Sequence, residues 1–90
     1  MILPGHTAPP PAVTRAAIDD ESRRIRRLQI VVRLALGIIA AGQIPYEEAS
    51  ELAAATRNVA LTLFPEGGET YDLLYHPKFR RLLREVYHLQ

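Results

Sequence analysis

The chain contains no cysteine, so it can form neither disulfide bridges nor thiolate metal sites, and nothing in its cysteine usage argues for secretion. It also lacks a long apolar stretch. The most apolar run, residues 28–41, is 14 residues long and contains Arg33, whereas a helix that crosses a bilayer needs about 20 apolar residues. The first residues lack the charged start and apolar core of a signal peptide. We therefore predict a cytoplasmic protein that does not engage a membrane.

Motifs that carry catalysis are absent as well. Gly67 and Gly68 follow a predicted helix and have no neighbouring lysine, so they do not form a phosphate-binding loop. Glu85 and His88 have a spacing used by metal sites in helical bundles, but the apolar seams offer no further acid or histidine. His76 has no nucleophile near it in sequence. We predict that the protein is not an enzyme and holds no metal or cofactor.

Ninety residues form one domain at most, and a domain of this size buries only about 60–65% of the surface that its unfolded chain exposes. Four of the seven prolines lie within residues 1–13. Because proline lacks an amide donor and disfavours a preceding helical turn, we predict that residues 1–13 form an extended or disordered arm. Residues 14–90 then form a single domain.

No alternation of apolar and polar residues persists for long enough to predict a strand. Helical spacing instead predicts helices over residues 14–41, 45–64, 71–75 and 77–89. Thr14 and Thr70 are the predicted N-caps of the first and third helices, Gly42 is the predicted C-cap of the first, and Pro45 opens the second. The short connection after Gly42 makes the first two helices antiparallel neighbours. The predicted fold class is all-α: an antiparallel hairpin followed by shorter helices.

Apolar residues three and four apart form a seam along each of the two long helices. A second apolar stripe, which includes Leu34 and Ile38, lies beside the seam of the first helix, so the second half of that helix is apolar all round and should be buried. Because 90 residues offer little with which to cover it, we predict a homodimer with a shared helical bundle. The residues predicted to form the core or dimer seam are Ile25, Leu28, Val32, Ala35, Ile39, Leu52, Val59 and Leu63.

Charge is segregated along the chain: residues 1–43 carry a net charge of +3, residues 44–72 carry −5 and residues 73–90 carry +3. This order suits segments that pack against one another, within a chain or between chains. Arg33 stands within the apolar run, and we expect its guanidinium either to reach water or to meet a carboxylate of the second helix, Glu47, Glu48 or Glu51.

Two functions remain open. The first is a non-catalytic interaction or scaffold module that self-associates and meets another protein. The less favoured alternative is a nucleic-acid-associated regulator that neutralises phosphates with its arginines; acidic residues on the second helix make it a poor reader of base edges. The residues predicted to form the interaction surface are Arg23, Arg24, Arg26, Arg27, Arg33, Tyr71, Tyr75, Arg80, Arg81 and Arg84.

Overall fold

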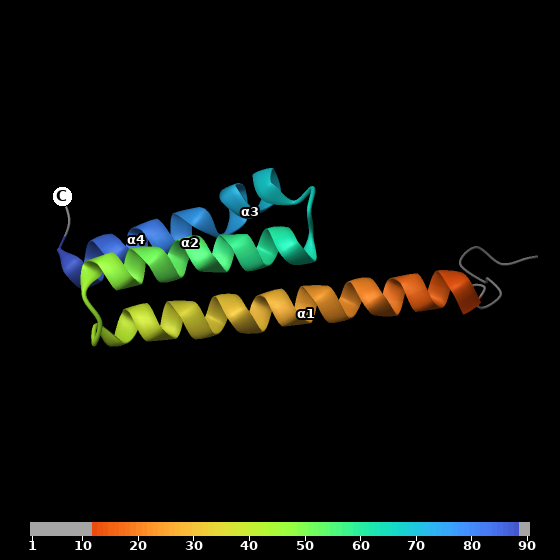
Figure 1. The fold of residues 1–90 in the computed structure, drawn as a ribbon, viewed down its shortest axis with the longest axis horizontal. Helices are drawn as coiled ribbons and strands as arrows, with labels where there is room; N and C mark the ends of the chain where they lie inside the picture. Colours follow the sequence, from red (N-terminus) through yellow and green to blue (C-terminus); the bar gives the residue numbers. More distant parts are fainter. Residues whose placement is uncertain (1–11, 89–90) are drawn as a thin grey trace, which may run out of the picture.

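The computed structural model describes residues 12–88, and within them the protein is all-helical, as predicted. Figure 1 shows three helices side by side, each antiparallel to the next, with a short helix at the corner between the second and the last. Residues 1–11, most of the predicted arm, lie outside the described part, whereas residues 12 and 13 belong to the first helix. The helices are α1 (Ala12–Ala41), α2 (Tyr46–Leu63), α3 (Gly68–Leu74) and α4 (His76–Tyr87).

The turn between α1 and α2 begins at Gly42, the predicted C-cap. Gly42 adopts a left-handed conformation with φ of 65°, and its amide donates a hydrogen bond of 3.0 Å to the carbonyl of Ile39. A Cβ at Gly42 would lie 3.4 Å from Cγ1 of Val86, so the turn also lies against α4. The Tyr87 hydroxyl donates a 2.6 Å hydrogen bond to the carbonyl of Ile44. The end of α4 is thereby fixed to this turn.

Helix α2 begins after Pro45, whose extended backbone (φ −62°, ψ 158°) places it at the N-cap. The Pro45 carbonyl accepts the first helical hydrogen bond from the Ala49 amide at 3.0 Å. Glu47 and Glu48 occupy the first turn, where carboxylates are favoured by the helix dipole. The observed helix is one residue shorter at each end than the predicted range.

The C-terminal third departs from the predicted boundaries. Thr70, predicted as an N-cap, lies inside α3, because the preceding turn closes through a 2.9 Å hydrogen bond from the Gly67 amide to the carbonyl of Phe64 and α3 begins directly afterwards. Only Tyr75 separates α3 from α4. Pro77 stands in the first turn of α4, where its missing amide leaves no helical hydrogen bond unmade.

The core lies between α1, α2 and α4 and is closed at the corner by α3. Side chains from one face of α1 meet small residues of α2, among them Ala49 and Ala60, which allow the two helices to approach closely. Thr56 is buried there and its hydroxyl donates a 2.8 Å hydrogen bond to the carbonyl of Leu52, so it is satisfied. The buried apolar residues are Leu28, Val32, Ala35, Ile39, Ala49, Ala60, Tyr71 and Phe79.

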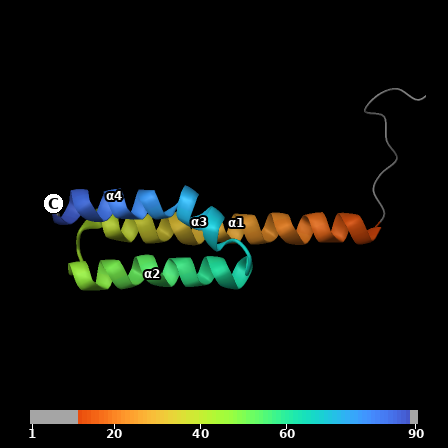
Figure 2. The ribbon, with the colours of Figure 1, turned by 90° about the horizontal axis from the view of Figure 1, so that it is seen from above.

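Helix α1 is longer than its partners, and its first part extends past the rest of the bundle (Figures 1 and 2). All side chains of residues 14–23 are exposed; we call them the projecting segment. Thr14, predicted as an N-cap, lies within this helical segment. Among residues 12–88, no helix is long and apolar enough to cross a membrane.

Candidate interaction surface

Three large apolar side chains on α1 point away from the core. Ile30, Leu34 and Ile38 are spaced four residues apart, so they form one row along the helix. They are 50%, 61% and 48% exposed, respectively. We call this row the outer face of α1. No charged residue lies between Arg33 and Glu47, so the last eight residues of α1 carry no charge that would interrupt the apolar surface. Apolar rows of this kind on a small protein mark sites of interaction.

Four of the eight residues predicted to form the core or dimer seam belong to the core of the single chain. Leu28, Val32, Ala35 and Ile39 are buried within one chain, because α2 and α4 cover that side of α1. Leu52 and Leu63 pack half-buried against the same core. Ile25 and Val59 remain exposed. From Leu28 to the end of α1, the exposed large apolar side chains are those of the outer face. The second stripe identified Leu34 and Ile38 but not Ile30.

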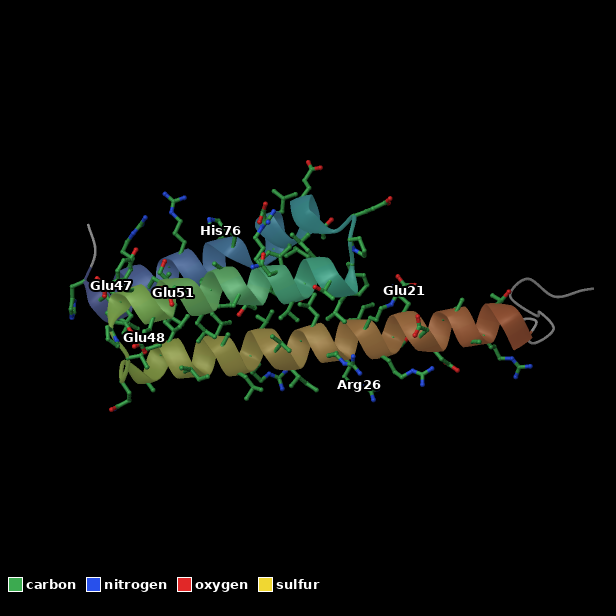
Figure 3. The ribbon with its side chains drawn as sticks, viewed as in Figure 1. Glu21, Arg26, Glu47, Glu48, Glu51 and His76 are labelled. Atoms are coloured by element: carbon green, nitrogen blue, oxygen red, sulfur yellow. The ribbon has the colours of Figure 1, made fainter. Side chains whose placement is uncertain are left out.

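The arginines predicted to form an interaction surface are mostly exposed. Arg33 reaches solvent, and it forms no ion pair with Glu47, Glu48 or Glu51 in the described part of the chain. Arg26 points from the side of α1 opposite α2, and so away from the carboxylates of that helix (Figure 3). The exposed arginines without an ion pair among residues 12–88 are Arg23, Arg26, Arg27, Arg33, Arg80, Arg81 and Arg84.

Among the arginines predicted to form the interaction surface, Arg24 is the exception, because it is half-buried. Its guanidinium lies over the ring of Phe64, 5.4 Å from the centroid, and its Nη1 donates a long hydrogen bond of 3.4 Å to the carbonyl of Leu63. Its Nε lies 3.5 Å from Oδ2 of Asp20, close enough for an ion pair but without a hydrogen bond. Arg24 therefore anchors α1 to the end of α2 and is not a free part of the surface.

Tyr71, which was also predicted to belong to the interaction surface, is buried in the structure. It is 4% exposed and belongs to the core, with its ring centroid 5.3 Å from that of Tyr75. Its hydroxyl is buried without a hydrogen-bond partner in the described residues. Burial raises the pKa of Tyr71 to about 12. Tyr75 is half-buried, with Nζ of Lys78 lying 5.7 Å from its ring centroid. The two aromatics hold the corner of the bundle together.

A bidentate ion pair, which the sequence did not reveal, joins α2 to α3. Nε and Nη2 of Arg57 donate hydrogen bonds of 2.8 and 3.0 Å to the two carboxylate oxygens of Asp72. These hydrogen bonds hold the pKa of Asp72 below its usual value and raise the pKa of Arg57. Because the residues are 15 apart and on different helices, no local spacing signals the pair.

A hollow of about 310 Å³ between α2 and α4 brings Ser50 and His76 to the same depression. A serine nucleophile requires a hydrogen bond to its base, and none joins these two side chains in the structure. Nor do residues 12–88 contain a group of three or more acids and histidines able to hold a metal ion. The hollow offers no assembled catalytic arrangement.

Comparison with known proteins adds no assignment: no family model, no curated protein and no solved structure matches this chain.

Proposed function

We propose that the protein is a non-catalytic helical module that self-associates as a homodimer and serves as an interaction or scaffold unit. The observation that carries the proposal is the outer face of α1, where Ile30, Leu34 and Ile38 are each about half exposed, although the core-facing residues of the same stretch, from Leu28 to Ile39, are buried. Removing these side chains from water would stabilise a complex by roughly 25 cal/mol per Å² of apolar surface. A second copy supplies an identical, complementary row.

The test is the mass of the protein in solution. Sedimentation over a range of concentrations should show reversible dimerisation. Leu34→Glu should weaken it at least tenfold, since a carboxylate would be buried without a partner. Gln29→Glu is the matched control, because it adds the same charge at an exposed position of α1 outside the outer face. A single-chain mass for the unmodified protein at every concentration would refute the proposal.

A second candidate, association with nucleic acid, is favoured by the exposed arginines that have no ion pair among the described residues. Lysine and arginine contacts to phosphates release counterions, so such binding weakens steeply with salt. Titration of random duplex DNA at two or more salt concentrations separates the candidates. Micromolar affinity with a steep salt dependence, lost in an Arg80→Ala, Arg84→Ala double variant, would support the nucleic-acid function.

A further inference from the structure

We infer that two copies of the chain pair antiparallel through the outer faces of α1, crossing at Leu34, so that Arg27 of each copy meets Glu48 of the other. This inference rests on the proposed self-association and specifies its geometry. It follows from the symmetry of the apolar row, from the placement of charge beside it, and from the lack of an ion pair at Arg27 or Glu48 within residues 12–88.

The apolar row is symmetric about its centre. Leu34 stands in the middle and is its most exposed member, with Ile30 and Ile38 four residues to either side. An antiparallel two-fold axis at Leu34 sets Ile30 of one copy opposite Ile38 of the other, and places Leu34 against itself. Rows of residues four apart form the ridges that pack into one another in helix pairs. The row thus fits a second copy of itself.

The charges next to the row favour the antiparallel direction. Arg27 is seven residues before Leu34 and therefore lies on the same side of α1. A parallel pair would set Arg27 against Arg27. An antiparallel pair sets it level with residue 41 of the other copy, at the C-terminal end of α1, where the helix dipole favours a cation.

Glu48 stands at that same end of the bundle. It lies in the first turn of α2, on the side that faces α1, between the two ribbons in Figure 3. An arginine of the second copy that arrives at the end of α1 therefore meets a carboxylate as well as the helix terminus. Both Arg27 and Glu48 are exposed, and neither forms an ion pair within residues 12–88. Each is free to pair with the other copy.

Disulfide trapping tests the crossing point, and the chain has no cysteine of its own to interfere. In the antiparallel pair, Leu34→Cys should cross-link to itself under mild oxidation. The axes of packed helices lie about 8–10 Å apart and each Cα stands about 2.3 Å from its axis, so facing Cα atoms come within the roughly 4.4–6.8 Å that a disulfide spans. Ile30→Cys and Ile38→Cys should each fail to self-link, since eight residues separate the equivalent positions by about 12 Å along the axis. A mixture of these two variants should cross-link. Efficient self-linking of all three would show a parallel pair and overturn the inference.

Charge reversal tests the ion pair. Arg27→Glu and Glu48→Arg should each weaken dimerisation, by on the order of tenfold, because each places two like-charged pairs across the interface. Mixing the two variants should restore the affinity, since every pair in the mixed dimer is again of opposite sign. Arg26→Glu, which makes the same charge change one residue earlier and therefore about 100° around α1 from Arg27, is the matched control.

The outcomes separate the inference from the proposed function. A dimer that Leu34→Glu disrupts, but that shows neither the predicted cross-linking pattern nor recovery on mixing, overturns the antiparallel geometry and leaves self-association standing. A protein that remains a single chain overturns both. Recovery on mixing together with self-linking at Leu34→Cys alone establishes the inferred arrangement.

Discussion

At the scale of single residues, Tyr71 combines a well-buried ring with a hydroxyl that has no hydrogen-bond partner among the described residues. A buried hydroxyl without a hydrogen bond costs about 1–3 kcal/mol, whereas the ring alone contributes apolar contact. We expect Tyr71→Phe to increase the free energy of unfolding by about 1 kcal/mol, measured by urea denaturation. A loss of stability in the variant would mean that the hydroxyl has a partner.

The same residue predicts an alkaline dependence of stability. Burial raises the pKa of Tyr71 to about 12 in the folded chain, from 10.0 in an unperturbed tyrosine. Between these values the unfolded chain has released the proton and the folded chain still holds it, so rising pH favours unfolding. The stabilisation is complete below pH 10 and is lost toward pH 12. Denaturation curves of Tyr71→Phe should show a smaller loss over this range than those of the unmodified protein.

At the scale of the helical elements, two glycines should respond oppositely to the same substitution. Gly42 has a φ of 65° and a neighbouring Val86 methyl, so Gly42→Ala strains the turn and should cost about 1 kcal/mol or more. Gly37 lies inside α1 with open space around a Cβ, so Gly37→Ala should stabilise the helix by about 0.5–1 kcal/mol. Both are best measured by denaturation in the Leu34→Glu background, which keeps dimerisation out of the comparison. Changes of the same sign would contradict the assigned backbone roles.

The elements themselves could largely be predicted, because helical spacing and end signals are local properties of the sequence. Gly42 and Pro45 bounded α1 and α2 to within a residue. Thr70 misled the prediction for α3, since the turn before it closes through Gly67 and allows the helix to begin earlier. The Arg57–Asp72 ion pair joins residues on different helices, so only the folded arrangement reveals it.

At the scale of the whole molecule, the sequence could not show which side of α1 would be covered. Both the seam and the stripe beside it are apolar, so helical periodicity alone cannot tell which of the two is buried. The choice depends on where α2 and α4 pack, which is set by their small residues and by the corner at α3. The arrangement covers Ile39 fully and leaves Leu34 as the most exposed residue of α1's apolar row. The apolar surface available to the proposed second copy is therefore the outer face and not the seam.

Because α1 is longer than the helices packed against it, one part of its seam is buried and the other part is exposed. Ile18 and Ile39 occupy equivalent positions of the same heptad pattern, yet Ile18 is 51% exposed and Ile39 is 0% exposed. The difference arises because α2 ends at Leu63, level with Arg24, and cannot cover the projecting segment. We expect Ile39→Ala to lower the free energy of unfolding by about 2–4 kcal/mol, through lost burial and a residual cavity. Ile18→Ala should change it by no more than about 0.5 kcal/mol. Denaturation of both variants tests this, and a comparable loss for Ile18→Ala would show that the projecting segment is covered in solution by a second copy or another chain.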